Sequence, residues 1–129
     1  MNRRDRERGA AVVEFALVMP LLVLLVMGIV EFGRAYQAQT SLSGAARAGV
    51  RVMALQNDPV AARAATKAAA FGLSVSDAQI SVSPSTCTVT GSTPPPTVVV
   101  TVTYPITFFT HQFGVGVTLT GKGSMRCNG

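Results

Sequence analysis

Charged residues are scarce in this sequence and unevenly placed. They make up 13% of the 129 residues, whereas a soluble domain usually carries about 25%. Six of them lie within residues 3–8, and the next 21 residues contain only one, Glu14. A simple soluble globule does not have this layout, so the distribution of charge excludes that class.

Histidine and cysteine are too few to build a metal centre. His111 is the only histidine, and Cys87 and Cys127 are the only cysteines. Their spacing matches no zinc-binding pattern. Two cysteines instead fit one disulfide bond, provided that the compartment is oxidising, and in the chain-entropy model that bond stabilises the fold by about 4 kcal/mol. We expect no metal and no cofactor.

Patterns for catalysis and for nucleic-acid binding are also missing. The sequence has no serine elbow, no phosphate-binding loop and no H-E-x-x-H. Few aromatic residues lie near its dispersed basic residues, so the net charge of +5 does not indicate a nucleic-acid partner. The acidic residues after position 9 are Glu14, Glu31, Asp58 and Asp77. They belong to a helix or to its connections, so we do not expect a catalytic site of paired carboxylates. We expect a protein that is not an enzyme.

A long apolar run extends from Ala10 to Val30. As a helix it would be about 31 Å long, close to the ~30 Å hydrocarbon thickness of a bilayer. The arginines that precede it predict a cytoplasmic N-terminus and an exported C-terminal part. The run is too long for a cleaved secretory signal, and no A-x-A site follows it. The sequence therefore predicts a single-pass membrane protein with membrane lipid as one partner.

Two residues interrupt this run. A carboxylate within hydrocarbon costs several kcal/mol, so Glu14 either lies near the interface or pairs with a cation. Cleavage after Gly9 would give Ala10 a free amine one helical turn away, which could pair with Glu14 of the same chain or of a neighbour. Pro20 removes the amide that would bond to the Ala16 carbonyl, which predicts a kink or weak point in the helix. Membrane helices tolerate prolines, so this kink has either a functional or a purely structural meaning.

The spacing of these residues resembles a known processing site. Arg8-Gly9, four small residues and then Glu14-Phe15 resemble a type IV prepilin cleavage site. The continuation is similar to the TadE-like family of Tad pilus pseudopilins. Four segments carry this resemblance most clearly: 14–17, 20–22, 31–34 and 45–47. The VTVTYP run at 100–105 and the TLTGKGSMR run at 118–126 also resemble the family's exported end.

The resemblance implies a role and a set of partners. A prepilin peptidase would cut after Gly9, and the mature chain would act with other Tad pilins and assembly proteins as a minor pilin or assembly factor of an adhesive Tad (type IVc) pilus. TadE and TadF types both remain open. The alternative is an uncleaved, membrane-anchored protein whose exported domain binds a partner or ligand. A third hypothesis is a soluble secreted enzyme or binding module.

Helical periodicity continues beyond the apolar run to about Gln56. Its small residues form one face that could pack against other pilin helices or against the protein's own strands: Ala35, Ala38, Leu42, Ala45, Gly49 and Val52. Asp58 is expected to cap a second helix over residues 59–72, with Pro59 in its first position and Gly72 as its stop.

Alternating residues after position 73 predict strands at 78–83, 86–90, 97–104 and 115–127. We expect a small antiparallel sheet of three or four strands on the distal half of the long helix, with Cys87 and Cys127 at its ends. Residues 106–113 carry three phenylalanines and form either a core plug or an exposed docking loop. The predicted class is α+β and pilin-like. Its parts are a leader (1–9), a membrane helix (10–30), a helical extracytoplasmic region (31–72) and an exported β-domain (73–129).

Overall fold

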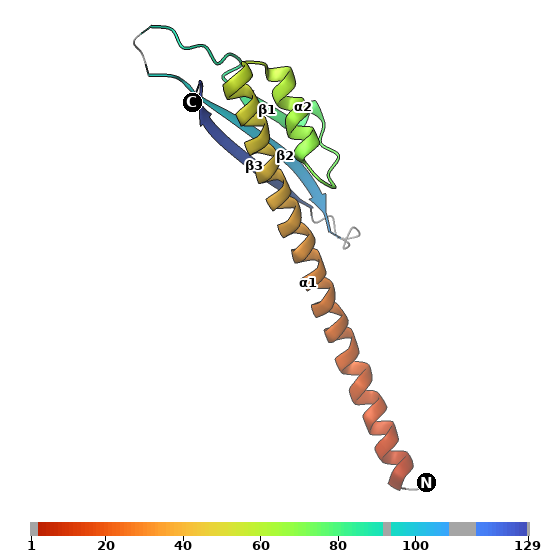
Figure 1. The fold of residues 1–129 in the computed structure, drawn as a ribbon. Coiled ribbons are helices and arrows are strands. Elements are labelled where there is room, and N and C mark those ends of the chain that lie inside the picture. The colour runs from red at the N-terminus through yellow and green to blue at the C-terminus, as the bar shows by residue number, and fades with distance from the viewer. Residues whose placement is uncertain (1–2, 92–93, 109–115, 129) are drawn as a thin grey trace. The chain divides into compact units, whose positions relative to one another are not determined.

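The structure is a computed structural model, and it describes residues 3–91, 94–108 and 116–128. The chain divides into two compact units, Met1–Arg34 and Ala35–Gly129. Helix α1 (Arg3–Gln56) belongs to both units. The second unit also holds α2 (Pro59–Ala69), a short 3-10 turn (Asp77–Gln79) and the strands β1 (Ile80–Ser83), β2 (Thr97–Thr107) and β3 (Gly116–Arg126). The α+β prediction is confirmed (Figure 1).

The first unit is a stretch of single helix whose side chains are almost all exposed. Its large apolar residues lie in the open, for example Leu17 at 74% and Leu24 at 70% exposure. Pro20 lies inside the helix, which remains α-helical on both sides of it. Since no described part of this unit covers the apolar side chains, their burial depends on lipid or on other molecules.

The corner between the two helices follows from three consecutive residues. Asn57 has a left-handed backbone (φ 51°), and its amide donates to the Met53 carbonyl at 3.0 Å, which ends α1. The Asp58 carboxylate accepts hydrogen bonds from the Val60 and Ala61 amides. With Pro59 in the first position of α2, the predicted end and the predicted cap are both confirmed.

Helix α2 ends earlier than the sequence predicted. Its last residue is Ala69, three residues before the expected stop at Gly72. Ala70 is buried, and its amide bonds to the Lys67 carbonyl in a tighter turn. That turn unwinds the chain before Gly72, whose positive φ of 74° completes the change of direction.

The three strands form one antiparallel sheet in the order β1-β2-β3. Strand β2 is central, with Val82 of β1 opposite Val100 and Gly123 of β3 opposite the same Val100. The alternation predicted for β2 is confirmed: Val98, Val100 and Val102 are fully buried. Strand β2 continues through Pro105 to Thr107. Proline has no amide to donate, but β1 pairs only with residues 99–102, so β1 needs no hydrogen bond from residue 105.

The predicted strand at 86–90 is wrong. These residues have no regular secondary structure. The Cys87 amide donates to the Asn57 side chain, and its sulfur is bonded to Cys127. These two attachments fix the segment against the end of α1 instead of placing it in a ladder.

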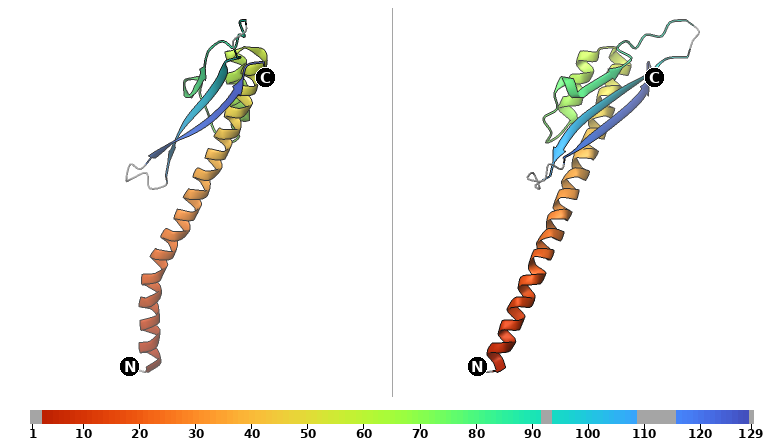
Figure 2. Two further views of the ribbon diagram at one scale, coloured as in Figure 1. Left: turned by 90° about the vertical axis from the view of Figure 1, so that its left-hand side faces the viewer. Right: turned by 180° about the vertical axis from the view of Figure 1, so that it is seen from behind.

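Both helices of the second unit cover the same face of the sheet (Figure 2). The core there is formed by buried residues of α1, α2 and β2, among them Leu42, Ala45, Met53, Ala62 and Val100. On the predicted small face of α1, Ala38, Leu42, Ala45 and Gly49 are buried, and Ala35 and Val52 are partly buried. This face therefore packs against the protein's own sheet and second helix.

Glycines allow the helices and the sheet to approach closely. A Cβ on Gly123 of β3 would lie 2.8 Å from the Ala46 carbonyl oxygen, and one on Gly121 would overlap the Leu42 carbonyl. One on Gly49 of α1 would overlap the Thr66 hydroxyl of α2. Each of these positions requires the absence of a side chain.

The alternation predicted for the last strand is correct in part. Cys127 is buried, and Leu119 and Met125 are partly buried against the core. Val117 is 44% exposed, because the strand extends past the end of the core at this point. Val115 lies outside the described residues.

Candidate functional site

The predicted processing and pairing residues lie together in the first unit. Gly9, Ala10, Glu14 and Phe15 lie on two consecutive turns of α1, and all four are exposed. Ala10 and Glu14 are four residues apart, so they share one helix face about 6 Å apart along the axis. Glu14 forms no hydrogen bond or ion pair with the part of the chain that the structure describes.

Packing does not explain the glycine at position 9. A Cβ built there meets nothing within 4 Å. Glycine also lowers helix stability by roughly 0.8–1.0 kcal/mol relative to alanine. Packing among the described residues therefore does not require glycine at position 9, and the same is true of Gly28, Gly33 and Gly44.

Helix α1 is long and apolar enough to cross a membrane. Its most apolar 18-residue window has a mean hydropathy of 2.6, and none of that window is buried. The Arg34 guanidinium donates to the Glu31 carboxylate at 3.0 Å, just after the apolar run ends. This composition indicates a single-pass membrane anchor.

The region that carries these features also matches a known family. Residues 9–51 match the family model of the TadE-like protein. The match begins at Gly9, includes Glu14, Phe15 and Pro20, and ends on the part of α1 that lies under the sheet. Comparisons with curated proteins and with solved structures gave no match. The predicted resemblance is therefore confirmed over the TadE-like segment, residues 9–51.

The TadE-like segment includes part of each unit. Its first part holds the exposed apolar residues of the first unit. Its second part, from Ala35 on, carries Ala38, Leu42, Ala45 and Gly49, which are buried under the sheet and α2. One continuous stretch of sequence thus supplies an uncovered apolar surface and the support for a folded domain.

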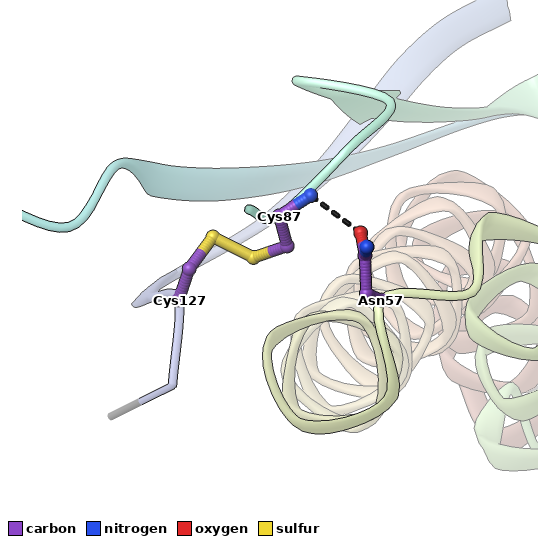
Figure 3. The surroundings of a disulfide bond; sticks show 3 residues. All are labelled: Asn57, Cys87 and Cys127. Carbon is purple, nitrogen blue, oxygen red and sulfur yellow. Dashed lines mark hydrogen bonds between the residues drawn. A yellow bond between two sulfur atoms is a disulfide. The ribbon is translucent and has the colours of Figure 1, made fainter. Parts of the chain in front are cut away.

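The predicted disulfide between Cys87 and Cys127 is present (Figure 3). Both residues are buried, and their Cα atoms are 5.4 Å apart. The Cys127 amide donates to the Pro96 carbonyl at 2.9 Å, and the next amide, of Asn128, donates to Ala54 at 3.0 Å. The bond therefore lies in a network that attaches the segment after β3 to the end of α1.

Two other candidate sites have different outcomes. Among the described residues, no group of three histidine, cysteine or acidic side chains could hold a metal ion, and His111 lies outside them. Of the phenylalanine-rich segment, Ile106 and Phe108 are partly buried, and residues 109–113 lie outside the described residues.

Sequence reasoning missed two features of this domain. The first is the closely packed pair Gly121 and Gly123, whose signal is their spacing of two, which places both on one face of a strand. The second is the opposite face of the sheet, which no helix covers (Figure 2). Its signal is the run of threonines at alternate positions of β2.

Proposed function

We propose that this chain is a minor pilin or assembly protein of a Tad pilus, anchored in the membrane by its TadE-like segment. The match over residues 9–51 carries the proposal. It is supported by the exposed apolar helix, because a helix with no cover of its own needs lipid or the helices of neighbouring subunits around it. The chain acts by assembly in this proposal and not as an enzyme.

Processing after Gly9 belongs to the same proposal. A prepilin peptidase would release Ala10 with a free amine on the helix face that carries Glu14. The Glu14 carboxylate has no partner among the described residues of its own chain, so the amine of a neighbouring subunit can neutralise it within hydrocarbon. This pairing would set the axial register of adjacent helices and allow incorporation into a pilus used in surface adhesion.

Two observations support an exported second unit. The arginines at 3, 4, 6 and 8 precede the apolar run, and cytoplasmic flanks are enriched in such residues. The disulfide requires an oxidising compartment, which lies outside the cytoplasm in most cells. Together they support a cytoplasmic N-terminus and an extracytoplasmic C-terminal domain.

Replacing Gly9 by valine should block processing. The recovered protein should keep its leader and start at Met1, whereas the unaltered chain should start at Ala10, because the peptidase would no longer find glycine before the cut. N-terminal sequencing and intact mass of protein from the native cells measure this directly. Gly28→Val is the matched control, since a Cβ there also meets nothing within 4 Å, and it should be processed normally.

An unaltered chain that starts at Met1 would contradict processing. That result would leave the second candidate, an uncleaved membrane-anchored protein whose exported domain binds a partner. It would also remove the Ala10 amine as a partner for Glu14.

Replacing Glu14 by glutamine should leave membrane insertion and processing intact but impair assembly. An unpaired charge within the bilayer costs about 3 kcal/mol, so loss of the pair should reduce the number of pili by roughly tenfold or more. Counting pili by electron microscopy measures the effect. Asp77→Asn makes the same chemical change in a surface ion pair with Lys67 and should leave pili unchanged. Normal piliation in the Glu14→Gln strain would refute the pairing.

A further inference from the structure

The uncovered face of the sheet in the second unit carries a regular array of hydroxyl groups. The helices pack on the opposite face (Figure 2). Alternate residues of β2 and β3 therefore point away from the core, and their side chains are exposed or half-exposed. Most of these residues are threonine or serine: Thr97, Thr101, Thr103, Thr107, Thr118, Thr120 and Ser124. We call this surface the hydroxyl face.

Two cations extend from the hydroxyl face, and the acidic side chains of the described residues do not pair with them. Lys122 lies opposite Thr101 and Arg126 lies opposite Thr97 in the β2–β3 register. Neither cation forms an ion pair with any residue in the described ranges. The acidic side chains of the second unit are engaged elsewhere, since Asp58 caps α2 and Asp77 pairs with Lys67. The face is therefore cationic, which favours an anionic partner.

The spacing of the cations favours a polymer over a small anion. Four residues along a strand separate Lys122 and Arg126 by about 13 Å. One small anion cannot contact both side chains at that separation without drawing them together. An extended chain of repeated negative charges, lying along β3, meets both of them and crosses the row of hydroxyls as well.

The hydroxyl array favours a sugar polymer over a nucleic acid. Threonine and serine hydroxyls both donate and accept hydrogen bonds, as sugar hydroxyls do. The outward positions of β2 and β3 carry no aromatic side chain on which a base could stack. Two cations are also few for a nucleic-acid site, whose affinity depends mainly on phosphate neutralisation.

We propose that the hydroxyl face binds an acidic polysaccharide that lies along β3, with Lys122 and Arg126 contacting its carboxylate or sulfate groups. This binding does not depend on the role in a pilus, because it uses only residues of the second unit. It would give the exported domain a direct means of attaching to an anionic, hydrated surface layer.

Binding to immobilised polygalacturonate tests the proposal, with the full chain purified in detergent micelles. The fully methyl-esterified polymer is the matched ligand, because it has the same sugar backbone without the charges. We expect binding to the acidic form only. Lys122→Gln/Arg126→Gln should weaken it by roughly tenfold, as two exposed charge pairs predict. Raising salt from 50 to 200 mM should weaken binding about sevenfold, if each of the two neutralised charges contributes a slope of about −0.7 to the plot of log affinity against log salt, as for a single-stranded polyanion.

A second pair of cations provides the control. Arg51→Gln/Arg63→Gln removes the same net charge from α1 and α2 and should leave affinity within about twofold, because distant exposed charges are screened. Thr101→Val keeps the β-branched shape beside Lys122 and should weaken binding by removing one hydroxyl.

Four results would overturn the proposal. They are no binding to the acidic polymer, equal binding to the esterified polymer, an equal loss in the control pair, and stronger binding to duplex DNA that Lys122→Gln/Arg126→Gln abolishes. The last result would assign the face to a different class of macromolecule. Tyrosine fluorescence of each variant establishes that the domain remains folded, since Tyr104 packs against the core.

Discussion

Replacing Gly121 by alanine should destabilise the second unit by about 3 kcal/mol, the upper end of the cost of overpacking a core. The added methyl group would overlap the Leu42 carbonyl oxygen and carbonyl carbon. These are backbone atoms of a helix, and they cannot rotate away as a flexible side chain would. Strand β3 would have to move off α1, which would open the contact at Gly123 as well.

Urea unfolding of the full chain in micelles, followed by tyrosine fluorescence, measures this effect. The chain has no tryptophan, so the signal comes from tyrosines, of which Tyr104 packs against the core. Gly44→Ala is the matched control on α1, because a Cβ there meets nothing within 4 Å. It should stabilise the helix slightly, by up to about 1 kcal/mol. A Gly121→Ala protein as stable as the parent would show that β3 does not pack on α1 at this distance.

Removing the disulfide should produce the other large loss of stability. The cysteines are 40 residues apart, and for a loop of that length the chain-entropy model gives about 4 kcal/mol. That amount approaches the whole stability of many domains of this size. We expect Cys87→Ala/Cys127→Ala to lower the free energy of unfolding by about this much, and to leave the domain partly unfolded at 37 °C.

The same urea titration, carried out with and without reductant, checks this result. The unaltered chain in reductant should unfold at nearly the same urea concentration as the double alanine variant. Reductant should not change the variant itself. Equal stability of the oxidised parent and the variant would show that the bond adds nothing to the native fold.

Local chemistry explains what the sequence predicted well. The end of α1 at Gln56 and the start of α2 depend on Asp58 and Pro59, whose effects act over three or four residues. The burial of Val98, Val100 and Val102 follows from alternation within one strand. The cysteine pair was found by counting, because two cysteines allow only one bond within a chain.

Tertiary contacts explain what the sequence did not predict. Residues 86–90 alternate like a strand, but the bonds from Cys87 to Asn57 and Cys127 fix them elsewhere. The requirement for glycine at 121 and 123 exists only because a helix distant in sequence lies over them. The alternation of residues 86–90 gives no sign of those bonds, and the spacing of the two glycines shows only that they share one face of a strand. A prediction from local pattern therefore could not contain either contact.

The position of the disulfide also determines how this domain responds to mechanical load. A pulling force applied between α1 and the segment after Cys127 passes through the sulfur–sulfur bond and not through β2 or β3. The sequence separation of 40 between the cysteines corresponds to about 130 Å of extended chain. That length stays out of the load path for as long as the bond is oxidised. The domain can therefore lengthen under tension only by the residues outside the covalent loop, and a reducing agent, not greater force, would release the remainder.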